Sequence, residues 1–234
     1  MCYLAVTRTR SALHMPVFWR SRTFPDRAAA GAALARELEG RGLAKPLLVL
    51  ALPRGGVPVA HEVARVLDAP LDVMLVRKVG MPGQPELAIG AVASGGIAVH
   101  EPGIENDFPG LAETFARIAA QERRELERRE RLYRVGLQPL ELKGKTVILV
   151  DDGLATGSTM LAAVRAARAG GAAAIVVAAP VASPQATALL RAEADDVVIL
   201  QTPAMLVAIG EWYEDFSQLD DATVCRLLGL HRRG

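Results

Sequence analysis

Two adjacent aspartates follow a short apolar run in the stretch VILVDDGLATGST, residues 147–159. The apolar run is typical of a buried strand, and Asp151 and Asp152 stand where that strand would end. In a parallel sheet, ligands bind beyond the carboxyl ends of the strands. Because burying two carboxylates is costly, we expect them to meet hydroxyl groups, a metal ion or solvent at the edge of the sheet.

The loop after the aspartates offers backbone N–H groups, hydroxyl groups and the start of a helix, a combination that binds phosphate. Gly153 and Gly157 permit backbone conformations and a close approach that a side chain would prevent. Carboxylates for sugar hydroxyls beside amides for a phosphate describe a receptor for a ribose 5-phosphate.

A second glycine-containing loop, LPRGG at residues 52–56, also follows an apolar run and precedes a helical pattern. Arg54 supplies a cation and the glycines let the backbone approach an anion, as a pyrophosphate-binding loop requires. A surface cation at a strand end is the plain alternative for Arg54. Arg77 and Lys78 end the next strand at the corresponding level, where a snorkelling surface lysine is the alternative.

The stretch at 147–159 resembles the phosphoribosyl pyrophosphate (PRPP) binding motif of type I phosphoribosyltransferases, in which an apolar strand, two acids and two further residues precede Ala-Thr-Gly-x-Thr. With LPRGGVPVA and LDVMLVRKVGMPGQPELAIGAV, it is most similar to a bacterial group of predicted phosphoribosyltransferases whose acceptor is not settled. The resemblance covers most of residues 25–220. Receiver domains and Rossmann folds also end strands on acids, but neither has this order of acids and glycines.

The resemblance implies a role for each of these residues. Asp151 and Asp152 would hold the ribose 2- and 3-hydroxyls and lie near a magnesium ion that is bound together with PRPP. The residues that would wrap the 5-phosphate are Ala155, Thr156, Gly157, Ser158 and Thr159. The residues that would bind the pyrophosphate are Arg54, Gly55, Gly56, Arg77 and Lys78. In this family the loop that binds pyrophosphate often contains a non-proline cis peptide. The residues expected to act in catalysis are Lys78, Arg54, Asp151 and Asp152.

The activity that this resemblance implies is transfer of the 5-phosphoribosyl group from PRPP to an unidentified acceptor, expected to be a nitrogenous base, with release of pyrophosphate. Magnesium and basic groups would stabilise the leaving pyrophosphate while the sugar becomes oxocarbenium-like, and no protein nucleophile is required. Two alternatives stay open: a PRPP-binding regulator without turnover, and a phosphoribosyl hydrolase. Arg54, Lys78 and the long segment after them favour catalysis.

The sequence excludes some classes of acceptor but does not identify the acceptor itself. Enzymes that salvage 6-oxopurines usually carry an acid where this chain has Ala155, so the resemblance disfavours hypoxanthine and guanine. The lysine-rich lid signature of the orotate enzyme is absent, because residues 79–110 contain no lysine. The most aromatic stretch, IGEWYEDF at 209–216, offers Trp212 and Tyr213 for stacking on a base, although an anchor for the C-terminal segment is at least as good an interpretation.

Alternating strand and helix patterns must position these residues. Strands are expected at 47–52, 71–76, 146–152, 173–180 and 197–202, and helices at 26–42, 57–69, 111–135, 158–169 and 183–194. The order predicts an α/β fold with a doubly wound, mainly parallel five-stranded sheet flanked by helices. The resemblance adds a flexible lid and a small hood made by the N- and C-terminal segments.

Residues 79–110 are rich in glycine and proline, and a segment of this length is too long for a loop that only connects two elements of a compact domain. AIGAVASGGIAV at 88–99 is expected to form a hairpin that turns at its Gly-Gly pair, and the remainder a mobile lid that excludes water. Glu86 is a candidate lid acid with a solvated loop acid as the alternative, and the role of His100 is open. His61, inside an apolar helical pattern, is expected to be structural.

The chain is expected to divide into an extension at 1–24 that is disordered at its start, a phosphoribosyltransferase-like domain at 25–220 and a C-terminal helix or tail at 221–234. Met15 is an alternative start to Met1. Early positive charge without a continuous apolar core and a cleavage site argues against a signal peptide.

Composition disfavours several classes of partner. The net charge is +1 and no basic stripe is interleaved with aromatics, which argues against a nucleic-acid partner. No apolar run reaches the roughly 18 residues needed to cross a bilayer. Cys2 and Cys225 lack metal-ligand spacing, which indicates a reducing compartment, and we expect a cytoplasmic protein. Members of the superfamily are commonly homodimers, so the helix at 111–135 is a candidate interface or simply a solvent-facing cover.

Overall fold

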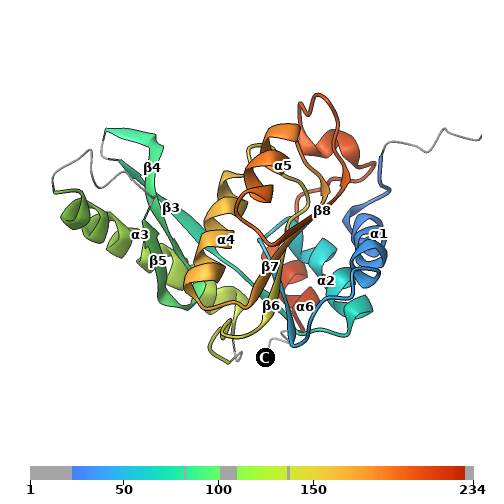
Figure 1. The fold of residues 1–234 in the computed structure, drawn as a ribbon, viewed down its shortest axis with the longest axis horizontal. Coiled ribbons are helices and arrows are strands. Elements are labelled where there is room, and N and C mark those ends of the chain that lie inside the picture. The colour runs from blue at the N-terminus through green and yellow to red at the C-terminus, as the bar shows by residue number, and fades with distance from the viewer. Residues whose placement is uncertain (1–22, 82, 101–109, 136–137, 230–234) are drawn as a thin grey trace, which may run out of the picture.

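The computed structural model describes residues 23–229 except 82, 101–109 and 136–137, and for residues 84–88 it describes the backbone alone. A parallel five-stranded sheet forms the centre of the fold (Figure 1). Its strands are β1 (Leu47–Ala51), β2 (Leu71–Val73), β6 (Thr146–Val150), β7 (Ala174–Val181) and β8 (Asp196–Gln201). They follow the order β2-β1-β6-β7-β8, and each neighbouring pair is parallel, as predicted.

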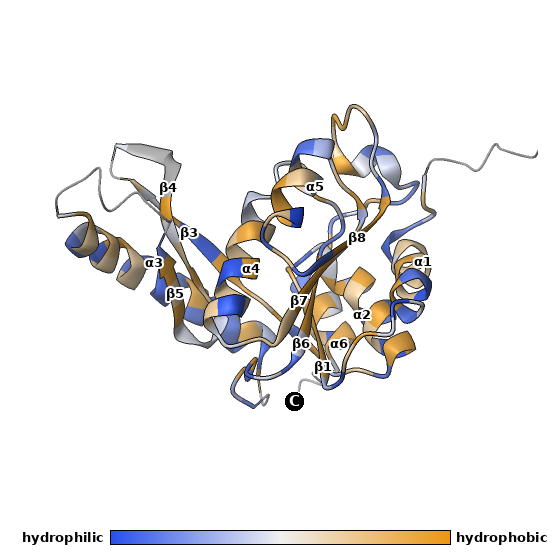
Figure 2. Ribbon diagram, viewed as in Figure 1, coloured by the Kyte–Doolittle hydropathy of each residue, from blue (hydrophilic) through white to orange (hydrophobic). Residues whose placement is uncertain are grey.

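Helices cover both faces of this sheet, which confirms the doubly wound α/β class. One face carries α1 (Arg27–Glu39), α2 (Gly56–Leu67) and α6 (Asp221–Leu227), and the other carries α4 (Ser158–Ala169) and α5 (Pro184–Arg191). Every residue of β1 and β6 is buried, because strands covered on both faces have no polar side. Figure 2 shows these apolar strands running through the middle of the molecule.

The helix starts predicted from the sequence are in place. Asp26 caps α1 by accepting a hydrogen bond from the backbone N–H of Ala29 at 2.7 Å. Ser183 caps α5 in the same way, with Ala186 N–H at 3.0 Å, and Pro184 occupies the first helical turn. These local signals therefore fix where two helices enter the fold.

A second, antiparallel sheet stands beside the first, with strand order β3-β4-β5. Its strands are β3 (Val76–Met81), β4 (Gln84–Ala93) and β5 (Ile97–His100). The sheet lies between α4 and the long helix α3 (Leu111–Tyr133), which are seen on either side of it in Figure 1. The turn between β4 and β5 passes through Gly95 at a φ of +76°, which confirms the predicted hairpin.

Two sequence predictions were wrong in this region. The strand expected at 71–76 is split, since β2 ends at Val73 and the chain then enters β3 in the other sheet. Residues 79–87, expected to be part of a mobile lid before the hairpin, contribute instead to the end of β3 and the start of β4. The remaining part of the expected lid, residues 101–109, lies outside the described residues.

One glycine of this segment, Gly90, has a packing role inside a strand. A Cβ at Gly90 would stand 2.5 Å from the ring of Phe115, so glycine lets α3 press against β4. The pairing of β3 with β4 also shifts register around Gly80. Glycine within a strand often marks such a bulge or a close approach, and it weakens the sequence signal for a strand.

The N- and C-terminal segments meet, as expected of a hood. Phe24 and Tyr213 form a parallel bridge, in which the Phe24 N–H donates to the Trp212 carbonyl at 2.8 Å. From the middle of α2, His61 Nδ1 lies 2.9 Å from the Leu227 carbonyl, so this histidine holds α6 in place. Within the described residues, no helix is both long enough and apolar enough to span a membrane.

Gly31→Ala is expected to lower the free energy of unfolding by about 1–3 kcal/mol, because α1 crosses α2 at this residue. An added Cβ would lie 2.6 Å from the Val59 carbonyl oxygen. Gly40→Ala is the control, since the nearest atom to its Cβ would be 3.7 Å away and its φ is −67°. Urea unfolding of both variants measures the difference, and equal stabilities would contradict this close helix contact.

Candidate active site

The two glycine-containing loops meet where the winding of the main sheet reverses. Strands β1 and β6 are neighbours, but the chain leads from β1 to β2 on one side and from β6 to β7 on the other. Such a reversal opens a crevice at the carboxyl ends of the two strands. Leu52 N–H donates to the Val150 carbonyl at 2.9 Å, so the loop after β1 is bonded to the end of β6. The predicted pyrophosphate and ribose motifs therefore share one site.

The carboxylate of Asp152 lies directly against the loop after β1. A Cβ at Gly55 would stand 2.1 Å from Asp152 Oδ2, and a Cβ at Gly56 would stand 2.6 Å from the Val150 carbonyl oxygen. Only glycine leaves room for this contact. The peptide between Pro53 and Arg54 is cis, as the family resemblance led us to expect.

Arg27, the first residue of α1, is a site residue that the sequence prediction missed. Its Nε donates to Asp152 Oδ2 at 2.7 Å, and the two side chains are only 11% and 14% exposed. Its Nη1 donates to the Ser217 carbonyl at 3.0 Å, and the guanidinium lies over the Phe216 ring, 3.8 Å from the centroid. One cation thus joins the acidic strand end to the C-terminal segment.

Asp151 has a different environment from its neighbour. Its Oδ1 accepts a hydrogen bond from the Asp152 N–H at 2.9 Å. Burial, and after it the neighbouring charge of Asp152, raises the pKa of the Asp151 carboxyl well above its ordinary value. The adjacent acids therefore differ: Asp152 has a cation as partner, whereas ionised Asp151 needs a hydroxyl donor or a cation from a ligand.

Tyr213 is a buried residue that holds the backbone of Asp152 in place. Its hydroxyl donates to the Asp152 carbonyl at 2.6 Å, and the residue is 5% exposed. Burial, and then the charge of Asp152, raises the pKa of the hydroxyl, which keeps it a neutral donor. The ring is enclosed by Phe24 and Phe216, with centroids at 5.7 and 5.1 Å. The structure thus places Tyr213 in the interior and not where it would stack on an acceptor, while Trp212 is half-buried.

The loop expected to take the 5-phosphate opens α4. Gly157 precedes the helix with a φ of +74°, a conformation that favours glycine. The hydroxyl oxygens of Thr156 and Ser158 lie 3.1 Å apart at the helix start. Ala155, Thr156 and Thr159 are exposed, so this part of the loop is accessible to a ligand. A helix start of this kind attracts an anion.

The same loop is fastened to the next strand connection. Leu154 N–H donates to the Val181 carbonyl at 2.9 Å, and Ser183 Oγ donates to the Ala155 carbonyl at 2.6 Å. Because the Ser183 hydroxyl also caps α5, one side chain links two elements. The loop is therefore held in shape before any ligand is present.

Of the two basic residues on β3, the structure brings one to this loop. Lys78 Nζ lies 3.4 Å from Ser158 Oγ. Arg77 Nε donates instead to Glu122 Oε2 of α3 at 2.6 Å. Successive side chains of a strand point to opposite faces, so β3 turns Lys78 toward α4 and Arg77 toward α3. The predicted pyrophosphate role of Arg77 is thus not supported by its placement.

A cavity of about 450 Å³ lies beside Asp152. Its lining residues come from α1, the loop after β1, the strand end and the C-terminal segment: Arg27, Arg54, Gly55, Asp152, Phe216, Gln218 and Leu219. Arg54 Nη1 donates to the Leu219 carbonyl at 2.9 Å. Phe216, 36% exposed, is the aromatic residue of this lining. The cavity combines cations, an acid and a ring, which suits a charged sugar and a planar group.

The donor set fits a magnesium ion that is shared with a ligand. In the part of the chain that the structure describes, no group of three or more His, Cys, Asp or Glu side chains could hold a metal alone. Mg²⁺ is commonly bound by one or two carboxylates together with phosphate oxygens. Asp151 and Asp152 are such a pair.

Comparison with known proteins supports the family that the two loops suggested. Residues 23–215 match the model of the phosphoribosyl transferase domain. The chain belongs to this family. The crystal structure of TT1426 from Thermus thermophilus is 47% identical and superposes with a TM-score of 0.81 over 88% of this chain and 97% of that one. The family recognised from the motif is therefore confirmed.

Two curated relatives come from Mycobacterium tuberculosis. Rv0571c of strain H37Rv and MT0597 of strain CDC 1551 carry provisional names as phosphoribosyl transferases, and each is 42% identical over 212 residues. The match covers 90% of this chain but 48% of each relative, so the chain spans about half the length of the curated relatives it matches.

Asp151→Asn is expected to stabilise the unliganded protein at neutral and higher pH. The pKa of Asp151 is higher in the folded protein than in the unfolded chain. The free energy of unfolding of wild type therefore falls as the pH rises from the unfolded-state pKa to the folded-state pKa, because the folded protein must then ionise a carboxyl that it holds more easily in the neutral form. Asparagine keeps an oxygen for the Asp152 N–H and carries no charge. The variant should exceed wild type by about 1 kcal/mol at about pH 8, and by less at about pH 4.

Urea unfolding at the two pH values measures this difference. A variant that is less stable than wild type at the higher pH, or a difference that does not change with pH, would contradict the raised pKa.

Proposed function

We propose that the protein transfers the 5-phosphoribosyl group of PRPP to a nitrogenous acceptor and releases pyrophosphate. The observation that carries this proposal is the meeting of two loops at the β1–β6 crevice. One loop brings Arg54 and two glycines, and the other brings Asp151, Asp152 and the start of α4. Membership of the phosphoribosyl transferase domain family supports the same reaction.

In this proposal the sugar is held at both ends. Asp151 and Asp152 accept hydrogen bonds from the ribose hydroxyls, and Arg27 orients the Asp152 carboxylate through their 2.7 Å contact. The backbone N–H groups and hydroxyls at the start of α4 take the 5-phosphate. Fixing both ends aligns C1 with its acceptor, which lowers the entropic part of the barrier.

Bond cleavage then depends on stabilising the leaving group. The C1–oxygen bond to pyrophosphate breaks and its electron pair stays with pyrophosphate, while the acceptor nitrogen bonds to C1 and later gives up its proton to solvent. Lys78, whose Nζ reaches Ser158 of the 5-phosphate loop, and Arg54, which lines the cavity, are the cations proposed to bind the developing negative charge. A bound Mg²⁺ would neutralise charge on the pyrophosphate oxygens.

The acceptor is proposed to lie against Phe216. This ring lines the cavity, whereas the ring of Tyr213 is buried behind it. Arg27 lies over the Phe216 ring at 3.8 Å and the Tyr213 ring stacks on it at 5.1 Å, so a planar base would contact the edge of the ring. Gln218, which also lines the cavity, offers both a donor and an acceptor to the polar edge of a base.

Pyrophosphate release from PRPP and Mg²⁺ in the presence of a panel of purine and pyrimidine bases tests the proposal. Lys78→Ala is expected to lower kcat/KM by about a hundredfold, because it removes a cation from the charged transition state. Arg77→Ala is the matched control on the same strand and should stay within about threefold of wild type, since Arg77 faces α3.

The assay also separates the alternatives. Release that needs no base would favour a phosphoribosyl hydrolase, and PRPP binding without release with any base would favour a regulator. Equal losses in Lys78→Ala and Arg77→Ala would contradict the assignment of Lys78.

A further inference from the structure

The loop between β8 and the short helix η3 (Ile209–Trp212) exposes apolar side chains. It consists of residues 202–208, TPAMLVA, which contain no charged residue, and we call it the apolar loop. Met205 is 79% exposed and Val207 is 74% exposed, more than any other large apolar side chain of the described residues. Exposed apolar side chains that are gathered in one place commonly mark a surface that another segment covers.

The chain enters the described structure beside this loop. Phe24 forms a parallel bridge with Tyr213, and the Glu214 N–H donates to the Phe24 carbonyl at 2.8 Å. Because the two segments run in the same direction, the residues before Phe24 leave the bridge on the side of η3, which directly follows the apolar loop. Residues 1–22 lie outside the described residues. An extended chain spans up to about 3.5 Å per residue, so six residues reach about 20 Å from the bridge.

The sequence of residues 15–22, MPVFWRSR, is complementary to this surface. Its first five residues are apolar and include Phe18 and Trp19, and two arginines but no acid follow them. The described chain around the bridge is acidic instead, and its exposed carboxylates are those of Glu211, Glu214 and Asp215. An apolar run that meets an apolar loop, and arginines that meet exposed acids, favour the same placement.

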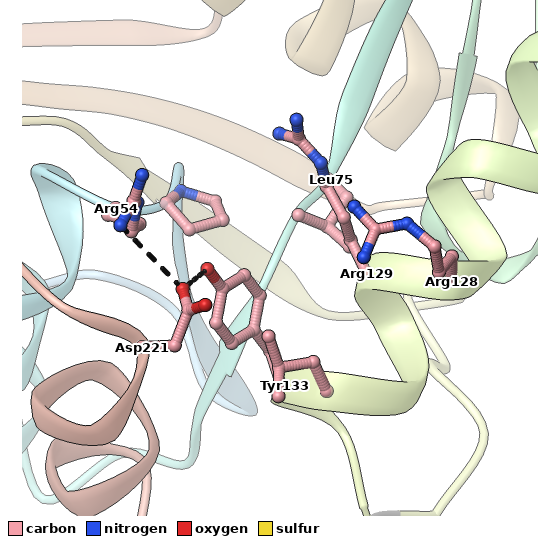
Figure 3. Close-up of a pocket in the computed structure, with 8 residues that line it drawn as sticks. Arg54, Leu75, Arg128, Arg129, Tyr133 and Asp221 are labelled. Atoms are coloured by element: carbon pink, nitrogen blue, oxygen red, sulfur yellow. Dashed lines mark hydrogen bonds and ion pairs between the residues drawn. The ribbon is translucent and has the colours of Figure 1, made fainter.

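The C-terminal helix is held at a different place in the fold (Figure 3). Asp221, the first residue of α6, accepts a hydrogen bond from the Tyr133 hydroxyl of α3 and lies 3.8 Å from Arg54. At the end of α6, the Leu227 carbonyl lies 2.9 Å from His61 Nδ1 of α2. In Figure 1, α6 lies low in the view and the loop after β8 lies at the top. The segment that precedes Phe24 is therefore better placed than the segment after α6 to cover the apolar loop.

We propose that residues 15–22 of this chain dock on the apolar loop and that Trp19 covers Met205 and Val207. Removing these side chains from water stabilises the docked state. The two arginines of the segment add attraction to the exposed acids around the bridge. This contact within the chain does not depend on the proposed transfer reaction.

The docked segment also bears on the ribose site through Ile209. This residue directly follows the apolar loop, and a Cβ at Gly153 would stand 2.5 Å from its side chain. Gly153 in turn follows Asp152. Covering the apolar loop thus steadies the residue that packs on the backbone next to the acidic strand end.

Tryptophan fluorescence tests the docking, because Trp19 and Trp212 are the two tryptophans of the chain. In the Trp212→Phe protein, emission comes from Trp19 alone, and we expect this side chain to be shielded from acrylamide. Adding Met205→Lys/Val207→Lys should raise the quenching constant at least about twofold, because lysines remove the apolar contact and repel the arginines of the segment.

The matched control is Val135→Lys/Leu189→Lys in the same Trp212→Phe background. It adds the same charge at exposed apolar positions away from the apolar loop and should leave quenching unchanged. Equal quenching in the two lysine variants would overturn the proposal. Shielding of Trp19 that appears only as the protein concentration rises would also overturn it, since a second copy of the chain would then cover the loop.

A second measurement keeps both tryptophans. Deletion of residues 2–21 is expected to increase binding of the apolar dye 1-anilinonaphthalene-8-sulfonate, because it uncovers the apolar loop. Met205→Lys/Val207→Lys in the deleted protein should abolish this increase. An increase that persists with the lysines in place, or no increase on deletion, would contradict docking on this loop.

Discussion

A carboxylate that is largely removed from water at the end of a strand needs a charged or hydrogen-bonding partner. At this site the carboxylate is that of Asp152, and the positions of the surrounding segments depend on how it is paired. Its partner is Arg27, which comes from the first residue of α1 and is itself nearly buried. The pair draws the start of α1 to the carboxyl end of β6. Because breaking such a pair by removing one member typically costs about 3–5 kcal/mol, the positions of the two elements depend on each other.

The C-terminal segment is organised around the same pair. Phe216 stacks on the Arg27 guanidinium, the Ser217 carbonyl accepts from it, and Tyr213 bonds to the Asp152 carbonyl. Residues from both ends of the domain thereby line one cavity together with Asp152 at the end of β6. The glycine at position 55 completes the arrangement, since any larger residue there would collide with the Asp152 carboxylate.

The parts of this fold that could be predicted from the sequence are those encoded locally. The caps Asp26 and Ser183, the apolar strands and the order of residues after Asp152 each act over a few neighbours, and they predicted the sheet and the two binding loops. The motif at 147–159 carried the family as well.

What sequence reasoning missed depends on contacts between distant segments. Arg27 is an ordinary arginine in the pattern of α1, and its pairing with Asp152 spans 125 residues. Arg77 and Lys78 were both predicted to bind pyrophosphate, because nothing in the sequence showed which face of β3 meets α3 and which meets α4. Gly90 of β4 added to the glycine-rich pattern that suggested a loop over 79–110, since its packing role needs the ring of Phe115 from a helix further along the chain.

Binding of PRPP with Mg²⁺ to wild type and to Asp151→Asn/Asp152→Asn, measured by isothermal titration calorimetry, tests the central claim most directly. Wild type is expected to bind with micromolar affinity and the variant to lose binding, with circular dichroism showing both proteins folded. Absence of binding by folded wild type, or equal binding by the variant, would contradict the assignment of the acidic strand end as the ribose site.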